Sequence, residues 1–108
     1  MIKILIDENL PLKLKFRFGN GFEVLTINDM GWNAKKNGEL LKLINIEAFH
    51  FLITSDKNIE YQQNLELINF KLVIINSSDN RYETVLPLID KIKERIIDPA
   101  SEKIIHVS

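Results

Sequence analysis

Five short apolar runs, separated by stretches with helical periodicity, most constrain the fold of this chain. The runs are rich in Ile, Val, Leu and Phe, and most are continuous rather than alternating with polar residues. Continuous apolar runs are typical of strands buried on both faces, as in a parallel sheet covered by helices. The expected strands are Ile2–Ile6, Phe22–Ile27, Phe49–Thr54, Lys71–Ile75 and Lys103–Val107.

Helical patterns lie between these runs. Residues Gly38–Ala48 place apolar side chains on one helical face, and Asn37 is a candidate N-cap. A weaker pattern covers Ile59–Ile68. Strands that alternate with helices predict an α/β domain with a doubly wound, about five-stranded and mainly parallel sheet, with helices on both faces. In such sheets the ligand site lies at the carboxyl ends of the strands, near the switch in strand order.

The last helical pattern covers Tyr82–Ile97 and contains a proline. Asn80 and Glu83 resemble a capping box at its start, with Asn in place of the usual Ser or Thr. Pro87 should either kink this helix or mark its true first turn, because proline lacks the backbone donor that a helix interior needs.

One segment, Leu10–Phe18, is ambiguous. It alternates apolar and polar residues with period two, which is the strand signature, and it could form a hairpin with the second strand. The helical interpretation rests on Asn9 as a cap and Pro11 in the first turn. We favour the helix, because neighbouring parallel strands normally need a crossover helix. A helix would turn Leu12 and Phe16 away from its buried face, either toward a partner or under covering loops.

Composition narrows the possible functions. A chain of 108 residues with 45% hydrophobic residues predicts one folded domain rather than a disordered chain. Its 14 basic and 15 acidic residues argue against a protein that grips nucleic acid by bulk positive charge. The lack of cysteine excludes disulfides and catalytic thiols. The sequence contains no membrane-spanning run and no signal peptide, so we expect a cytoplasmic protein without membrane association.

Acidic and amide side chains follow the expected strands. They are Asp7, Glu8 and Asn9 after the first strand, Asp29 after the second, Glu39 in the helix that follows, and Asp56, Lys57 and Asn58 after the third. Neighbouring carboxylates repel one another unless a cation or a proton relieves them. Hard oxygen ligands of this kind suit Mg²⁺ or Mn²⁺, which can hold a phosphate and activate a water.

Simpler roles compete with this interpretation. Asp and Asn are common after strands because they cap helices and form turns, and we prefer that role for Asp29. We prefer a functional role for Asp7 and Asp56, since each follows a separate apolar strand. For Glu8 two roles stay open: a metal ligand, or a solvent-exposed neighbour of the site. Glu39 could equally complement the dipole of its helix.

Other motifs carry less weight. The chain has no HExxH motif, no Gly-rich phosphate loop and no GxSxG elbow. Structural roles are expected for both histidines, and Trp32 is expected to cover the core, with base stacking as the alternative. Lys13, Lys15 and Arg17 form a basic grouping that is either a solvated face or a contact for RNA phosphates.

Five segments together resemble one family. They are Ile4–Pro11, Gly21–Val24, Asp29–Gly31, Glu39–Leu41 and Ile53–Asn58, in order and with matching spacing over roughly residues 2–97. The chain thereby resembles the small PIN-like domains that begin with a DENLP-type motif. These domains are regarded as toxins of bacterial type II toxin–antitoxin pairs and are related to VapC-type ribonucleases.

The resemblance implies a Rossmann-like PIN fold, a Mg²⁺- or Mn²⁺-dependent endoribonuclease centre, an RNA substrate and a cognate antitoxin that blocks the centre. Asp7 matches the family's first-strand acid, and Asp56 matches the first Asp of its Asp-Lys-Asp motif. The implied site has Asp7, Glu39 and Asp56 as catalytic residues, Asp7, Asp56 and Glu8 as metal ligands, and Asn9, Asp29, Asn37, Lys57 and Asn58 in support.

Two positions depart from the family pattern. Asn58 stands where the family usually has the second Asp of Asp-Lys-Asp, and Asn37 stands where it usually has an Asp at the start of the second helix. Asn keeps an oxygen ligand but removes a full charge, which weakens the attraction for a divalent cation. The departures keep open a catalytically inactive PIN-like protein that binds RNA or an antitoxin.

A third alternative is a phosphoacceptor receiver domain. Asp7, Glu8, Asp56 and the Ser77–Ser78 pair mimic its site, but the Lys-Pro expected after the fifth strand is missing. A homodimer is also open, since an uncovered edge strand invites pairing.

Overall fold

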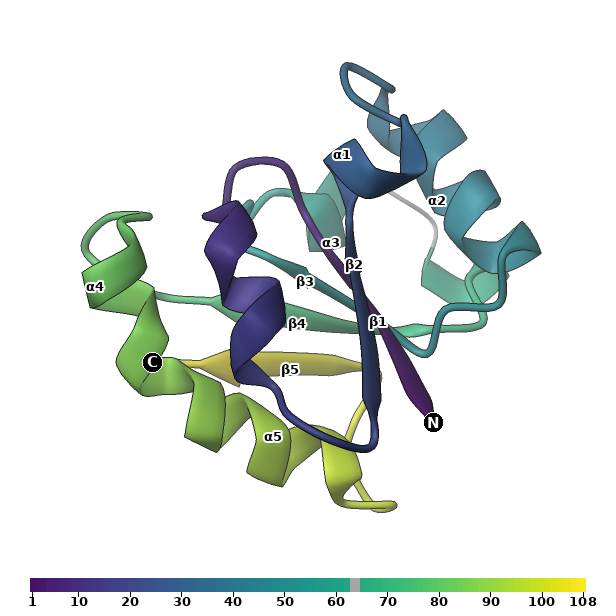
Figure 1. The fold of residues 1–108 in the computed structure, drawn as a ribbon. Coiled ribbons are helices and arrows are strands. Elements are labelled where there is room, and N and C mark those ends of the chain that lie inside the picture. Colours follow the sequence, from purple (N-terminus) through teal and green to yellow (C-terminus); the bar gives the residue numbers. More distant parts are fainter. Residues whose placement is uncertain (63–64) are drawn as a thin grey trace.

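The computed structural model describes residues 1–62 and 65–108, and their strands form one five-stranded sheet (Figure 1). Every neighbouring pair is parallel, and the order is β2-β1-β3-β4-β5. The strands are β1 (Ile2–Ile6), β2 (Phe22–Thr26), β3 (Phe51–Thr54), β4 (Lys71–Ile75) and β5 (Ile104–Val107). The predicted five-stranded parallel sheet is therefore confirmed, with strand ends that differ by two residues or fewer.

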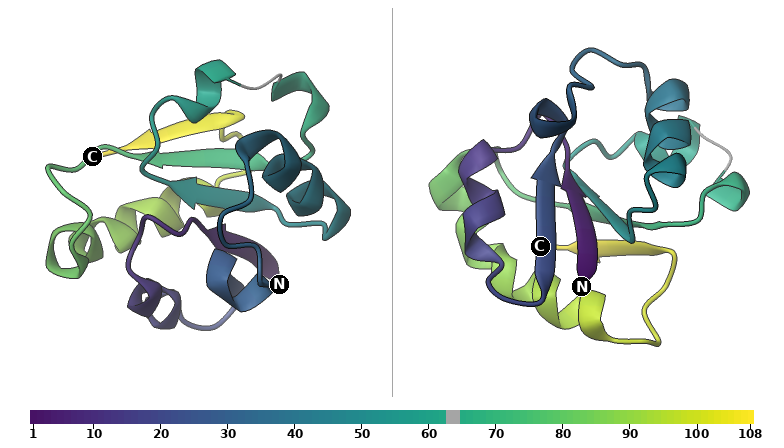
Figure 2. Two further views of the ribbon diagram at one scale, coloured as in Figure 1. Left: turned by 90° about the horizontal axis from the view of Figure 1, so that it is seen from above. Right: turned by 45° about the vertical axis from the view of Figure 1, so that its right-hand side comes forward.

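Helices cover both faces of the sheet, as expected for a Rossmann-like α/β fold (Figures 1 and 2). On one face lie the 3₁₀ helix η1 (Leu12–Arg17), α4 (Tyr82–Val85), the 3₁₀ turn η3 (Leu86–Leu88) and α5 (Ile89–Ile97). On the other lie α1 (Ile27–Met30), α2 (Asn37–Ile46), α3 (Ile59–Gln62) and the 3₁₀ turn η2 (Leu65–Leu67). Among the described residues, no helix combines the length and apolar character that crossing a membrane requires.

The continuous apolar runs are explained by burial on both faces. In β1, Ile4 and Ile6 pack in the cluster under η1 and α5, while Leu5 packs in the cluster under α2. In β4, Val73 packs in the cluster under η1 and α5, and Leu72 packs in the cluster under α2. Successive side chains of a strand point to opposite faces, so a sheet covered on both sides needs apolar residues at every position.

The ambiguous segment Leu10–Phe18 is helical, as favoured from the sequence, but the helix is of the 3₁₀ type. Leu10, Leu14 and Phe18 are buried against the sheet, whereas Leu12 and Phe16 are exposed. The amide of Leu14 donates a 3.2 Å hydrogen bond to the carbonyl of Pro11, which closes the first turn. The period-two pattern therefore reflects a helix that buries one apolar face and leaves two apolar side chains, Leu12 and Phe16, exposed.

All three predicted N-caps are wrong. Helix η1 begins at Leu12 with Pro11 as its cap, so Asn9 is not the cap and Pro11 precedes the first turn. Helix α2 starts at Asn37 itself, after Lys36 in extended conformation, so Asn37 is the first helical residue rather than the cap. Arg81, not Asn80, precedes α4, and the Asp79 carboxylate accepts the Arg81 amide at 2.9 Å. The cap of α2 lies one residue before the predicted Asn37, and the cap of α4 lies one residue after the predicted Asn80.

Pro87 interrupts the last helical segment, as predicted. The chain passes from α4 through η3 into α5, with Pro87 inside the 3₁₀ turn. The weaker helix expected over Ile59–Ile68 is found as α3 and η2, and its central part falls on residues 63–64, outside the described residues. Strand β3 begins two residues later than predicted, because the Phe49 amide still donates to Ile44 in the turn that ends α2.

Candidate functional site

The strand order places a switch point between β1 and β3. From β1 the chain crosses to β2 on one side, while β3 pairs on the other side of β1. A crevice at the carboxyl ends of two such strands is the usual ligand site of open parallel sheets. Asp7 directly follows β1, and its amide extends the ladder by a 3.0 Å hydrogen bond to the carbonyl of Ile53 in β3. The backbone of Asp7 is therefore fixed at the switch point.

A shallow hollow of about 370 Å³ lies at this edge of the sheet, and we call it the acidic depression. Its lining comes from the ends of β1 and β3, the first residue of α2 and the loop before α4. Every lining residue has a side-chain oxygen. They are Asp7, Glu8, Asn9, Asn37, Ser55, Asp56 and Asn80. The structure thus brings together five of the residues predicted for the site.

Thr54 connects the two aspartates that follow β1 and β3. Its hydroxyl donates a 2.6 Å hydrogen bond to Asp7 Oδ2 and accepts a 3.0 Å hydrogen bond from the Asp56 amide. Thr54 is fully buried, so no water competes for this hydroxyl. Asp7 Oδ1 accepts a further 2.8 Å hydrogen bond from the Glu8 amide. The Asp7 carboxyl is therefore held in one orientation from both of its oxygens.

The environment of Asp7 disfavours its charge. Burial raises the pKa of Asp7 above its ordinary 3.8, and the carboxylates of Glu8 and Asp56 raise it further, while hydrogen bonds from Thr54 and the Glu8 amide oppose the shift. A half-buried acid beside two other acids is relieved by a bound proton or a bound cation. Such environments are enriched at functional sites.

Asp56 is positioned by its own turn. Its Oδ1 accepts the Asn58 amide at 3.0 Å, and its carbonyl accepts the Ile59 amide at 3.4 Å, so the residues after β3 form a turn that leads into α3. Asn58 contributes its backbone to this turn, and its exposed side chain lies outside the lining of the acidic depression. Lys57 is also exposed and outside the lining.

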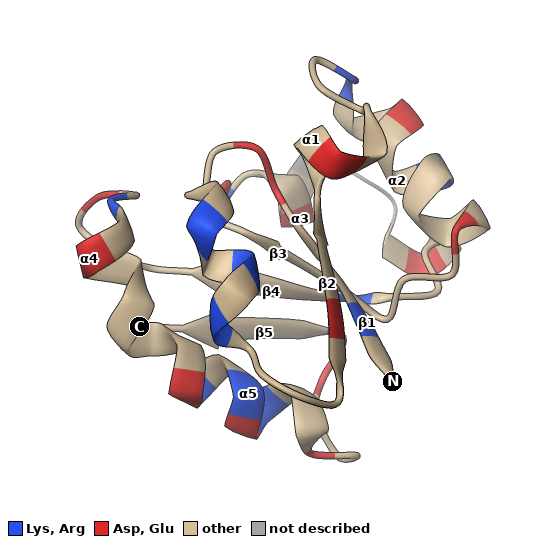
Figure 3. Cartoon of the chain, in the orientation of Figure 1, with Lys and Arg blue, Asp and Glu red and all other residues tan. Residues whose placement is uncertain are grey.

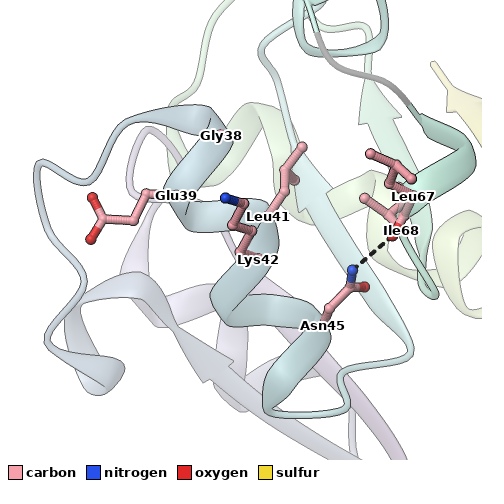
Figure 4. Close-up of a pocket in the computed structure, with 7 residues that line it drawn as sticks. All are labelled: Gly38, Glu39, Leu41, Lys42, Asn45, Leu67 and Ile68. Carbon is pink, nitrogen blue, oxygen red and sulfur yellow. Dashed lines mark hydrogen bonds between the residues drawn. The ribbon is translucent and has the colours of Figure 1, made fainter.

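Glu39 does not reach the acidic depression. Its side chain is 57% exposed and forms a 3.2 Å ion pair with Lys35, one helical turn earlier in sequence. It lies at one end of a different hollow, of about 530 Å³, formed by α2, Leu67 and Ile68, and it points away from these two apolar residues (Figure 4). The third acid of the expected catalytic set is therefore separated from the other two in this structure.

Asp29 has a local structural role, as preferred from the sequence. It forms a reciprocal capping box with Thr26 at the start of α1, with hydrogen bonds of 2.9 and 3.0 Å. The Lys15 ammonium lies 3.0 Å from both of its oxygens. The Thr26 amide, followed by Lys15, holds the pKa of Asp29 below its ordinary 3.8.

The histidines and the tryptophan lie outside the lining of the acidic depression. His50 Nδ1 accepts the Lys3 amide at 2.8 Å, and His106 Nε2 lies 3.4 Å from Glu60 at the opposite edge strand. Trp32 packs edge-on against Phe49, with 6.2 Å between ring centroids, and so covers the core beside α2.

The donor set suits a hard divalent cation only in part. Within residues 1–62 and 65–108, no three His, Asp or Glu side chains form a group that could hold a metal ion by itself. The acidic depression nevertheless offers carboxylate, amide and hydroxyl oxygens, which are the ligands that Mg²⁺ and Mn²⁺ prefer. Mg²⁺ commonly binds through one or two carboxylates, with water and substrate phosphates completing its shell. Asp7 and Asp56 are the two carboxylates that fit this role.

Ser55 and Asn80 in the lining, and the buried Thr54 that bonds Asp7, were not predicted as site residues. Thr54 matters most, because it holds the Asp7 carboxyl. The signal was present, since a hydroxyl ends an otherwise apolar strand two residues before Asp56. Comparison with known proteins adds no assignment: no protein-family model matches the chain, and no curated protein or solved structure is significantly similar to it.

Proposed function

We propose that the chain is a PIN-like, metal-dependent endoribonuclease, the toxin of a toxin–antitoxin pair, that hydrolyses RNA phosphodiesters at the acidic depression. One observation carries the proposal. Asp7 and Asp56 follow neighbouring parallel strands and line one hollow at the switch point of the sheet, where the buried Thr54 hydroxyl bonds the Asp7 carboxylate and the Asp56 backbone amide.

In this proposal Asp7 and Asp56 hold Mg²⁺ or Mn²⁺, and Glu8 stands at the rim of the acidic depression. When bound, such an ion polarises a phosphate and lowers the pKa of a bound water. Thr54 keeps the Asp7 carboxyl in place, and the amide groups of Asn9 and Asn37 offer neutral contacts to the substrate. The like charges of Asp7, Glu8 and Asp56 supply the attraction for the cation.

The proposed site is poorer in charge than the family pattern. Glu39 is paired with Lys35 outside the acidic depression, and amides occupy positions 37 and 58. A site with two well-placed carboxylates depends more on substrate phosphates to bind its cation. We therefore expect metal affinity to rise when RNA is present, and cleavage to be slow.

The test is RNA cleavage in Mn²⁺ by the wild-type protein, Asp7→Asn and Asp90→Asn. Asp90 is an exposed acid on α5, away from the acidic depression, and controls for loss of one negative charge. We expect Asp7→Asn to lose activity by about 100-fold or more, with Asp90→Asn unchanged and EDTA abolishing cleavage. Cleavage that survives EDTA, or that is equal in all three proteins, would refute the proposal.

A second candidate is a catalytically inactive PIN-like protein that binds RNA or an antitoxin. The Lys35–Glu39 ion pair and the amides at positions 37 and 58 favour it, because each removes an acid from the expected site. It predicts binding of a partner without any metal-dependent cleavage. Cleavage by the wild-type protein that EDTA abolishes would exclude it.

The receiver-like alternative has less support. Ser77, which would correspond to the receiver hydroxyl, donates to the Asp79 carbonyl at 2.6 Å and lies outside the lining of the acidic depression. Incubation with a small phosphodonor and measurement of intact mass tests this alternative. Addition of one phosphoryl group, absent in Asp56→Asn, would revive it.

A further inference from the structure

Helix η1 carries a local excess of positive charge in a chain whose net charge is −1. Residues 9–22 contain three basic residues and no acidic residue. Lys13 and Arg17 are exposed, and Lys15 is half-buried. In Figure 3 the basic segments of η1 follow directly along the chain from the acidic segment at the end of β1.

An exposed aromatic ring lies among these cations. Phe16 is 74% exposed, although the same helix buries Leu14 and Phe18. The Lys15 ammonium lies 5.2 Å from the centroid of the Phe16 ring. An aromatic face flanked by cations is the arrangement with which proteins bind single-stranded nucleic acid, since bases stack on the ring and phosphates meet the cations.

The charge of Arg17 is not neutralised by its partner. Its Nε donates a 2.5 Å hydrogen bond to the hydroxyl of Tyr82, and its guanidinium lies 5.9 Å from the centroid of the Tyr82 ring. A tyrosine hydroxyl is neutral, so it orients Arg17 and leaves its charge available. Lys15 differs, because Asp29 pairs with it at 3.0 Å. Lys13 and Arg17 are thus the cations that can meet phosphates.

Two separate chain segments connect this surface with the acidic depression. Asn9 lines the depression, and η1 begins three residues later at Leu12. Asn80 also lines the depression, and Tyr82, which bonds Arg17, follows two residues later. A single nucleic-acid strand bound along η1 would therefore extend toward Asp7 and Asp56.

We infer that η1 and Tyr82 bind single-stranded RNA that continues into the acidic depression, with Phe16 stacked on a base and Lys13 and Arg17 against phosphates. The inference rests on the proposed function, since RNA is its substrate. A neutral partner would have to desolvate these cations without compensation, which is unfavourable. A single-stranded nucleic acid can stack a base on the Phe16 ring and place its phosphates against the charges of Lys13 and Arg17.

The experiment measures fluorescence anisotropy of labelled oligouridine, about 12 nucleotides long, in EDTA so that no cleavage occurs. Phe16→Ala is compared with Ile46→Ala, which truncates a side chain of equal exposure on α2. We expect Phe16→Ala to weaken binding by about 5- to 100-fold, the effect of losing one stacked base. Ile46→Ala should bind like the wild type.

The cations are tested by salt dependence. Lys13→Gln and Arg17→Gln should each reduce the slope of log affinity against log salt by about 0.7, the value for one phosphate contact on a single strand. Lys42→Gln, on α2, should leave the slope unchanged. A duplex of the same length should bind more weakly, because its bases are stacked on one another already.

The outcomes separate this inference from the proposed function. Metal-dependent cleavage with equal RNA affinity in Phe16→Ala and Ile46→Ala would overturn the inference alone. RNA binding that depends on Phe16, without any cleavage, would overturn the proposed function alone. Absence of RNA binding would also overturn the inference. Self-association that Phe16→Ala abolishes would overturn it too, because it would assign this surface to a contact between copies of the chain.

Discussion

The hydroxyl of Thr54 bonds the carboxylate of Asp7 at 2.6 Å and so joins the carboxyl ends of two parallel strands at the switch point of the sheet. The same hydroxyl accepts the amide of Asp56, which fixes the second acid relative to the first. A buried hydroxyl that donates to the Asp7 carboxylate and accepts the Asp56 amide gives the candidate site its rigidity, because neither partner can move without breaking a bond inside the protein.

Removing this hydroxyl should therefore destabilise the protein. Thr54→Val keeps the side-chain shape but leaves the Asp56 amide without its acceptor, at a cost of about 1–3 kcal/mol. Urea unfolding measures the loss. Thr54→Ser restores the hydroxyl and is the control for the bonds. Equal stability of Thr54→Val and wild type would show that the hydroxyl does not organise the two acids.

The pKa of Asp7 should lie above 3.8, and carboxyl-carbon NMR can measure it. Because the folded pKa is raised above the unfolded one, ionised Asp7 disfavours folding, and this penalty appears as pH rises through the folded pKa. Asp56→Asn removes one like charge and should lower the midpoint, whereas Thr54→Val should raise it. A midpoint at or below 3.8 in the wild type would contradict the described environment.

Asp29 should show the opposite dependence. Its folded pKa is depressed, so its contribution to stability is present above pH 3.8 and is lost as pH falls through the folded pKa. Asp29→Asn should therefore be less stable than wild type near neutral pH and equal to it at low pH. Thermal unfolding across this range checks the sign, and a difference that grows on acidification would refute it.

The orientation of η1 gives a further prediction. Phe18→Ala removes a fully buried ring and should cost about 3–5 kcal/mol, whereas Phe16→Ala should change stability by about 0.5 kcal/mol or less. In a strand these two residues would share one face and behave alike. Similar losses in the two variants, measured by urea unfolding, would contradict the helix.

Much of the fold could be predicted from the sequence, because continuous apolar runs report burial on both faces. The strand-end rule also brought Asp7 and Asp56 together, since parallel strands end at a common edge. Helix starts were less predictable: Asn37 and Asn80 are good capping residues, but the backbone turns at Lys36 and Arg81 instead.

Glu39 shows why the rest of the site could not be predicted. Its position in the first turn of α2 could be predicted from the sequence, but the direction of its side chain could not. In the structure Glu39 pairs with Lys35 in solvent. The role of Thr54 could not be predicted because it depends on contacts between residues of different strands. A threonine at the end of a strand is unremarkable until the structure brings two acids within reach of its hydroxyl.

Metal binding at the acidic depression is the central claim, and calorimetric titration with Mn²⁺ tests it most directly. Wild type, Asp7→Asn and Asp90→Asn are titrated with a short oligouridine present, because substrate phosphates help to complete the shell of such an ion. The account predicts binding in wild type and Asp90→Asn that is lost in Asp7→Asn. Equal heats in all three proteins would contradict it.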